Sequence, residues 1–221
     1  MNRMPEEENA MNFKKINNVW QLLGGGVLAP AIITVLVLIW FFYPDVNRYQ
    51  WLLWLHLPLL MLHEFEEYVL PGGFKEFINT KTFVAPVPPV EDVPANEPYI
   101  FAVNMGFWLW IILGALLANI APWVGFVPVL LQVLINNFTH TFIFQGTQRG
   151  YNPGLFTTIV ILMPYCTLVF GYIILAHVFT PLDWLLGVAS GLAVMAILMT
   201  ITFTRLKLAN RERERCLRDA H

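Results

Sequence analysis

Six apolar segments dominate the chain and restrict it to one class of fold. They run over residues 22–43, 50–70, 99–120, 123–145, 154–179 and 183–205. Each is close to the roughly 20 residues that an α-helix needs to cross the hydrocarbon core of a bilayer. Only 13% of the 221 residues are charged, against about 25% in soluble domains. The sequence therefore predicts an all-α integral membrane protein, a polytopic bundle of six transmembrane helices.

The placement of Lys and Arg predicts how this bundle is oriented. Cytoplasmic loops of membrane proteins carry an excess of basic residues. With the N-terminus placed in the cytoplasm, all but one of the 13 basic residues fall on cytoplasmic segments, and Arg48 is the exception. We therefore predict cytoplasmic N- and C-termini in a multi-pass protein of a bacterial-type plasma (inner) membrane.

The same pattern divides the chain into three parts. Residues 1–21 form a cytoplasmic N-terminal segment, residues 22–205 a single transmembrane domain and residues 206–221 a basic cytoplasmic tail. The long loop 71–98 is either a lid that shapes lipid access or a proline-stiffened linker. A net charge of −2 gives no support for nucleic-acid binding. The two cysteines lie far apart in the sequence, which argues against a disulfide framework or a cysteine metal site.

An ionisable cluster closes the second apolar segment, where His63, Glu64, Glu66 and Glu67 fall within five residues. Such groups are costly in a membrane, since an acidic or basic residue at its centre costs about 2.5–3.5 kcal/mol. Successive helical residues turn by about 100°, so His63, Glu66 and Glu67 share one arc and Glu64 points elsewhere. An imidazole and two carboxylates gathered inside a membrane protein predict a functional site.

Polar residues of three other segments lie at the same predicted depth. Asn104 is early in the third segment, while Asn136 and His140 are one helical turn apart near the end of the fourth. Asn152 opens the fifth segment, where Asn-Pro-Gly is typical of a helix start. The predicted substrate-binding residues are Asn104, Asn136, Gln145, Arg149 and Asn152.

The chemistry of the predicted site has three interpretations. The predicted catalytic residues and candidate metal ligands are His63, Glu66, Glu67 and His140. Imidazole and carboxylate suit a divalent ion such as Zn, Fe or Mn, and one or two such ions could activate water or oxygen. Without a metal, the same groups could exchange protons with a substrate. In the third interpretation they form a structural polar network that pairs with Arg149 or with amides of the fourth segment.

The order of these motifs resembles a known family. His63-x-x-Glu66-Glu67 is followed by Asn104, by Asn136-x-x-x-His140 and by Asn152-Pro153-Gly154. This ordered set is similar to that of the HXXEE-domain membrane proteins over roughly residues 50–165. The resemblance implies a multi-spanning membrane protein with the polar motifs of an enzyme, and it implies nothing about the substrate.

We therefore predict a membrane-embedded enzyme that acts on a lipid or another hydrophobic small molecule. It is expected to be metal-dependent, of hydrolase or oxidoreductase type, with membrane lipid as its surroundings. One alternative is a metal-free acid/base isomerase or cyclase. The other is a non-enzymatic protein, either a metal-ion or proton transporter or a binding protein for a lipid or cofactor. A transport path calls for polar residues through the whole membrane thickness, whereas these crowd into one half.

Overall fold

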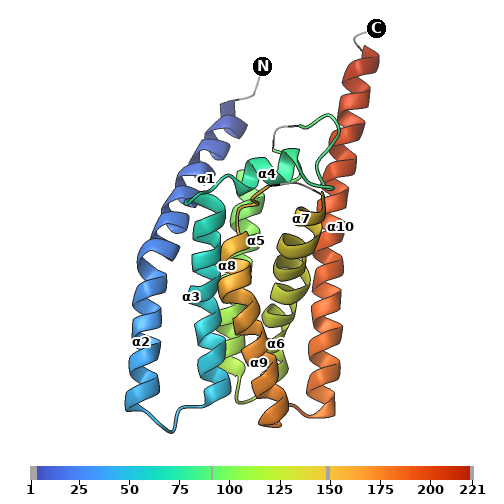
Figure 1. Cartoon of the computed structure of the whole chain (residues 1–221). Coiled ribbons are helices and arrows are strands. Elements are labelled where there is room, and N and C mark those ends of the chain that lie inside the picture. The colour runs from blue at the N-terminus through green and yellow to red at the C-terminus, as the bar shows by residue number, and fades with distance from the viewer. Residues whose placement is uncertain (1–3, 91, 148–149, 220–221) are drawn as a thin grey trace.

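The chain forms a bundle of long helices. The computed structural model describes residues 4–90, 92–147 and 150–219, and the regular structure in these ranges is all helical. Both described ends lie at the same end of the bundle (Figure 1). Five helices are long and apolar enough to cross a membrane: Asn12–Phe42, Glu97–Leu117, Pro122–Gly146, Leu155–Leu175 and Pro181–Arg211. The predicted all-α architecture of membrane type is thereby confirmed.

The first helix is longer than the apolar segment predicted at 22–43. It runs without interruption through α1 (Met4–Leu23), the π-helical turn η1 (Gly24–Leu28) and α2 (Ala29–Phe42). Glycines in η1 allow a close approach to the next helix, because a Cβ on Gly25 would overlap Phe65 and lie 2.8 Å from the Met61 carbonyl oxygen. The predicted segment is therefore the second half of one long helix.

Helix α3 (Arg48–Tyr68) lies inside the bundle and corresponds to the predicted segment 50–70. The Asn47 side chain caps it by accepting a hydrogen bond from the Gln50 amide at 3.1 Å. It packs against η1, α2, α5 and α9. Its polar residues keep it outside the five helices apolar enough to span a membrane, so a sixth span stays a prediction.

The remaining helices complete the bundle. They are α4 (Phe74–Thr80), α5 (Glu97–Leu117), α6 (Pro122–Leu131), η2 (Gln132–Asn137), η3 (Thr139–Ile143), α7 (Phe144–Thr147), α8 (Leu155–Thr157), η4 (Thr158–Leu162), α9 (Met163–Leu175) and α10 (Pro181–Asp219). Helix α4 belongs to the predicted loop 71–98 and lies across the end that carries both termini (Figure 1). A tight turn joins α5 to α6, and the two helices pack closely next to it, since a Cβ on Gly114 of α5 would lie 2.5 Å from Gly125 Cα of α6.

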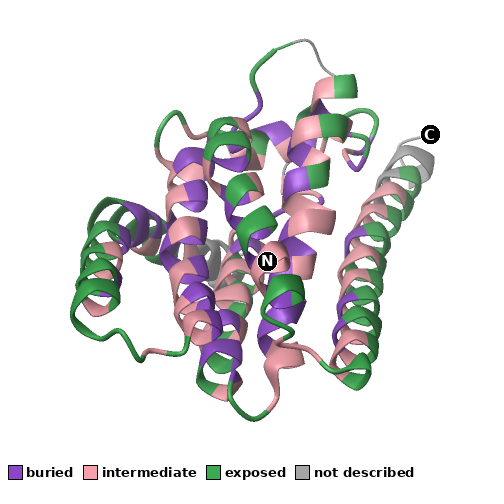
Figure 2. Cartoon of the chain, turned by 60° about the horizontal axis from the view of Figure 1, so that its bottom comes forward, coloured by how far each residue is buried: buried purple, intermediate pink, exposed green. Residues whose placement is uncertain are grey.

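The half of the bundle away from the two described chain ends holds an apolar core. This core consists of Tyr49, Leu52, Leu53, Ala115, Ala118, Phe126, Val129, Tyr165, Cys166, Val169 and Ile173. Its two phenols donate hydrogen bonds to backbone carbonyls, Tyr49 to Pro122 at 2.8 Å and Tyr165 to Leu52 at 3.0 Å. Buried residues face the interior, and exposed residues cover the outward faces of the outer helices (Figure 2).

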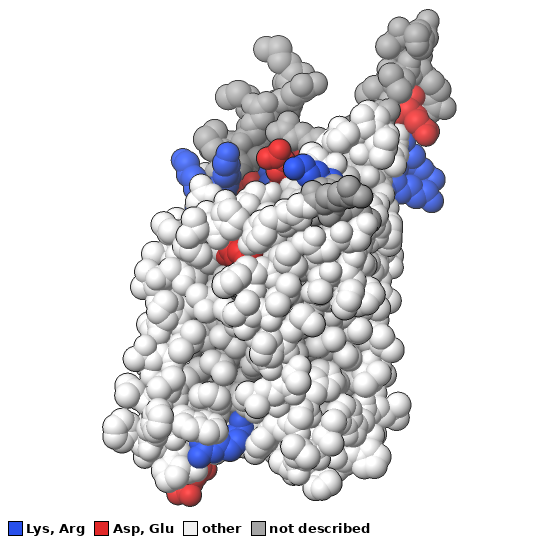
Figure 3. Space-filling view, viewed as in Figure 1, with Lys and Arg blue, Asp and Glu red and all other residues white. Residues whose placement is uncertain are grey.

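Charged side chains gather at the two ends of the face shown in Figure 3, and the body between them is almost uncharged. Several of the Lys and Arg residues lie at the end that carries both termini. Arg48, at the start of α3, belongs to the other end. This distribution agrees with the charge asymmetry read from the sequence.

Candidate functional site

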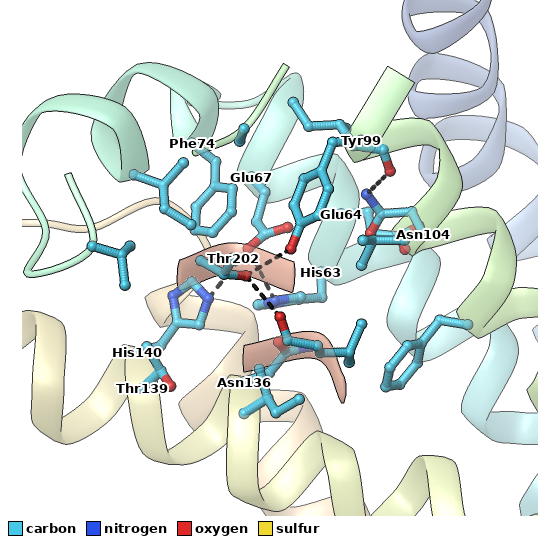
Figure 4. Close-up of a pocket in the computed structure, with 18 of the residues that line it drawn as sticks. His63, Glu64, Glu67, Phe74, Tyr99, Asn104, Asn136, Thr139, His140 and Thr202 are labelled. Carbon is cyan, nitrogen blue, oxygen red and sulfur yellow. Dashed lines mark hydrogen bonds and ion pairs between the residues drawn. The ribbon is translucent and has the colours of Figure 1, made fainter. Parts of the chain in front are cut away.

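A chamber of about 190 Å³ lies in the half of the bundle that carries both termini. Side chains from α3, α4, α5, η2, η3 and α10 line it (Figure 4). Its walls are mostly apolar, and its polar groups come mainly from α3 and from the π-helical segments η2 and η3. Two of the substrate-binding candidates, Asn104 and Asn136, are among the lining residues.

His63, Glu67 and His140 converge at one wall of the chamber. Glu67 Oε1 lies 3.4 Å from His63 Nε2 and 3.2 Å from His140 Nε2. The nearest ligand atoms of the three side chains all lie within 4.8 Å of one another, and all three residues are buried. We call them the His–Glu–His group. The structure thus brings together three of the four residues predicted as metal ligands.

Asn152 fixes the orientation of the His140 ring. The amide nitrogen of Asn152 donates to the His140 carbonyl at 3.2 Å, so its Oδ1 faces His140 Nδ1 at 2.7 Å. An amide oxygen can only accept, and this assigns the ring proton to Nδ1. In the neutral ring, the Nε2 lone pair of His140 then points toward Glu67. Sequence reasoning placed Asn152 at the site as a substrate-binding residue, whereas its contacts orient a histidine.

Thr157 orients the His63 ring in the same way. The Thr157 hydroxyl donates its proton to Glu66 Oε2. Its oxygen therefore accepts from His63 Nδ1, 2.9 Å away. In the neutral ring with its proton on Nδ1, the Nε2 lone pair of His63 also faces Glu67. A hydrogen bond from the other ring nitrogen is the usual way in which proteins orient a metal-binding histidine.

Glu66 lies apart from the His–Glu–His group and accepts hydrogen bonds at the start of the next long helix. Its carboxylate accepts from the Phe156 amide at 3.0 Å, from the Thr157 amide at 2.6 Å and from the Thr157 and Tyr151 hydroxyls. A carboxylate stabilises a helix N-terminus by satisfying its free amides. Burial and the hydrogen bond to Glu66 raise the pKa of the Tyr151 phenol, which keeps Tyr151 a donor.

Gly154 allows the α8 end to approach the group. Its φ of +96° is one that L-residues rarely adopt. A Cβ at this position would lie 2.7 Å from His140 Cε1, 2.8 Å from His63 Cε1 and 3.1 Å from Glu67 Cγ. The Asn-Pro-Gly sequence therefore does more than start a helix, since its glycine makes room for both imidazoles.

The other predicted residues have different surroundings. Asn104 donates from Nδ2 to the Ile100 carbonyl at 2.8 Å and to the Tyr68 hydroxyl at 3.3 Å. Asn136 donates to Gln132 Oε1 at 3.2 Å. Gln145 lies on α7 and is not among the residues that line the chamber. Arg149 lies outside the described residues.

Sequence reasoning missed Glu64 as a chamber residue. It does point away from the His–Glu–His group, as the 100° spacing predicts, and it lines the chamber next to α5. Its Oε2 accepts from Trp108 Nε1 at 2.7 Å, and within the described part of the chain its buried Oε1 has no hydrogen-bond partner. Its membership of a four-residue ionisable cluster was the available signal. Thr157 carried no such signal, because its role depends on how two distant helices pack.

Fold and site together define a helical bundle of membrane-spanning type with a buried histidine–carboxylate group in one half. A family model described as "protein of unknown function with HXXEE motif" matches residues 54–169, and the chain belongs to this family. The match includes the His63 motif, His140 and Asn152-Pro153-Gly154, which confirms the resemblance seen in the sequence. Neither the curated proteins nor the solved structures gave a match to the chain.

Proposed function

We propose that this protein is a membrane-embedded enzyme that acts on a hydrophobic small molecule or lipid, with a divalent metal ion held by His63, Glu67 and His140. The convergence of three potential ligand atoms within 4.8 Å of one another carries this proposal. When both imidazoles are neutral, the two Nε2 lone pairs face a carboxylate oxygen. Such an arrangement is repulsive until a cation occupies it.

The two distances from Glu67 to the imidazoles suit a metal. Around an ion with ligand bonds of about 2.0–2.1 Å, tetrahedral neighbours lie about 3.3 Å apart. The two ligand-to-ligand distances through Glu67 Oε1 are 3.2 and 3.4 Å. Two histidines and one carboxylate form a set typical of catalytic zinc sites, which leave one position free for water or substrate. Iron and manganese accept the same ligands.

The chain's own residues have distinct parts in the proposal. Asn152 and Thr157 orient the two imidazoles, and Glu66 holds Thr157. When bound, the metal would act as a Lewis acid or lower the pKa of a water molecule. Asn136 uses one of its two amide hydrogens on Gln132, so the second can donate to an oxyanion. Asn104 is less suited, because its Nδ2 already contacts two acceptors.

We also propose the six-span topology with cytoplasmic termini, in which α3 crosses the membrane inside the other helices. Both described ends and several of the basic residues lie at one end (Figures 1 and 3), which supports this orientation through the positive-inside rule. The chamber would then lie in the cytoplasmic half of a plasma membrane.

A metal-free acid/base enzyme is the second candidate, and one observation favours it. Glu67 Oε1 is close to both imidazole nitrogens, so a shared proton could relieve the same repulsion as a metal. Such a group could move protons in an isomerisation or cyclisation. The measurement below separates the two candidates.

The test is the metal content of gently purified protein, measured by inductively coupled plasma mass spectrometry. We expect about one divalent ion per wild-type chain and loss of that ion in Glu67→Gln and His140→Ala. His56→Gln is the matched control, since His56 is a buried histidine two turns away on α3. Wild-type protein without stoichiometric metal, both as purified and after incubation with zinc, iron or manganese, would leave the metal-free candidate. Metal retained in both variants would contradict the site.

A further inference from the structure

We propose that the chamber is entered sideways from the membrane, through a portal between α5, η2 and α10, and that its ligand is an uncharged molecule dissolved in lipid. This deepens the function proposed above and rests on it for the identity of the reaction site. The entry route itself is argued from the packing of the chamber walls alone.

The chamber walls differ in how far they are exposed. Four of the five lining residues on α3 are buried, with His63 and Glu64 each 1% exposed and Glu67 5% exposed, and Tyr68 is partly exposed. The partly exposed lining residues on the other side are Val103, Phe107, Asn136, Leu198 and Met199. Because these belong to α5, η2 and α10, the chamber is partly exposed along the seam between those elements. It is also partly exposed at the lining residues Phe74, Ile78 and Phe83 of the segment that covers its end.

The end of the bundle is covered, which argues against entry from water. Phe74 of α4 stacks on His140 with ring centroids 5.6 Å apart, and Phe77 packs against Phe144 at 5.0 Å. Asn79 fastens this cover by two hydrogen bonds to the backbone of Ala95, at 2.8 and 2.9 Å. Aromatic side chains therefore lie between the His–Glu–His group and this end.

Helix α10 is attached to its neighbours both before and after the stretch that lines the seam. Farther from the termini, its glycines pack on α6, since a Cβ on Gly187 would lie 2.7 Å from Phe126 and one on Gly191 2.7 Å from Leu130. Near the termini, the Tyr99 hydroxyl donates to Thr202 at 3.0 Å, because the Thr202 proton goes to its own helix.

A second hydrogen bond holds α10 near the Tyr99–Thr202 bond, since Arg205 Nε donates to the Pro94 carbonyl at 2.7 Å. Leu198 and Met199 lie between the two attachments, within the candidate membrane span Pro181–Arg211. The portal therefore faces hydrocarbon, and the Tyr99–Thr202 bond bounds it on the side of the termini.

Charge and size restrict the ligand. The described lining residues include two carboxylates, Glu64 and Glu67, and no Lys or Arg. No described lining side chain therefore supplies a positive charge to pair with an anionic head group, whereas an uncharged molecule needs none. A volume of about 190 Å³ is a little more than the roughly 150 Å³ cavity that accommodates benzene. Only a short apolar piece fits inside, so a longer ligand must extend through the portal into lipid.

The test uses a single reactive cysteine in the chamber. Asn136→Cys is placed in a Cys166→Ala, Cys216→Ala background, and the metal-stripped protein is reconstituted in liposomes. Its labelling rate is compared for N-phenylmaleimide, which is uncharged, and a sulfonated maleimide supplied on both sides. We expect the uncharged reagent to be at least tenfold faster after correction for the intrinsic reactivity of each reagent with a free thiol.

Two further variants examine the seam. Met199→Trp should slow labelling by the uncharged reagent several-fold, whereas Ile197→Trp, at a lipid-exposed position of the same helix, should not. Tyr99→Phe should speed labelling about fivefold, the factor that corresponds to one ordinary hydrogen bond.

Faster labelling by the sulfonated reagent, or no labelling of folded protein by either, would overturn the portal. Equal effects of the two Trp variants would also overturn it. The two-reagent comparison needs no Trp variant to fold. Because the protein is metal-stripped, failure of the metal site would leave these rates unchanged, and failure of the portal would leave metal content unchanged.

Discussion

The apolar core and the chamber are built on the same helices, yet they satisfy their polar groups in opposite ways. In the core, the Tyr49 and Tyr165 phenols each donate to a backbone carbonyl. In the chamber, side chains mostly pair with one another, and His63 Nε2 is left without a hydrogen-bond partner. Helix α3 runs through both regions, so one helix supplies a stable half and a reactive half.

This difference teaches where stability and function can be separated. Buried polar groups without partners are costly, and clusters of ionisable groups in unusual surroundings are typical of functional sites. Substitutions in the core should therefore change the free energy of unfolding and leave the site intact. Substitutions around the His–Glu–His group should do the reverse.

The largest effect on the free energy of unfolding is expected for a substitution in the apolar core. Phe126 is 1% exposed, and its ring packs against Phe170, Phe179 and Trp184 with centroids 5.2–5.4 Å apart. Phe126→Ala should lower the free energy of unfolding by about 3–5 kcal/mol, measured by reversible unfolding in mixed micelles. Metal content per folded chain should stay at the wild-type level. Phe41→Ala, at a position 74% exposed, is the control. Loss of metal in Phe126→Ala would break the comparison.

An intermediate effect is expected at Gly154. Gly154→Ala adds a methyl group against both imidazoles at a positive φ, so metal affinity should fall about tenfold or more, as when outer-shell support is lost. Competition with a chelator measures this affinity. Gly146→Ala is the matched control, because a Cβ there would meet nothing within 4 Å. Unchanged affinity in Gly154→Ala would show that the imidazoles do not need this close approach.

The smallest effect is expected at Lys75, outside both regions. Lys75 Nζ lies 2.6 Å from Asp92 and 2.9 Å from Glu97. Burial alone would lower the Lys75 pKa, but these two carboxylates outweigh it and raise the pKa. A raised pKa stabilises the folded state below the ordinary lysine value and loses that contribution as pH rises above it.

Lys75→Met should therefore cost about 0.5 kcal/mol at pH 8, with the difference from wild type shrinking above pH 10.5, the ordinary lysine pKa. The free energies of unfolding of both proteins in micelles, at pH 8 and above pH 10.5, measure this difference. A difference that grows with pH would contradict the assigned ion pairs. Metal content should stay unchanged at pH 8.

Helix spacing and predicted membrane depth were enough to predict the His–Glu–His group from the sequence. The four-residue spacing of His63 and Glu67 places both on one helix face, and the shared depth of His140 brings it to them. The same arc also included Glu66, which instead contacts α8. An arc of about 100° is wide enough to face two neighbouring helices, and only packing decides which side chain meets which neighbour.

The fold was predictable to a similar extent. Apolar length gave the helices, but it placed the start of the first one near residue 22, whereas that helix begins at Met4. A polar amphipathic stretch that continues an apolar helix carries little hydropathy signal. The roles of Thr157 and Gly154, and the Tyr99–Thr202 bond, depend on contacts between segments far apart in the chain, which no local pattern encodes.

The hydrogen bonds that Glu66 accepts from the Phe156 and Thr157 amides also bear on the order in which the helices can assemble. The chain emerges from the ribosome with α3 long before residue 157. Until the later helix arrives, Glu66 has none of its four donors, and Glu67 has no His140. We therefore expect α3 to enter the bilayer late, or to be shielded by the insertion machinery until then. The site can therefore form only when two helices about 90 residues apart in the chain are both present.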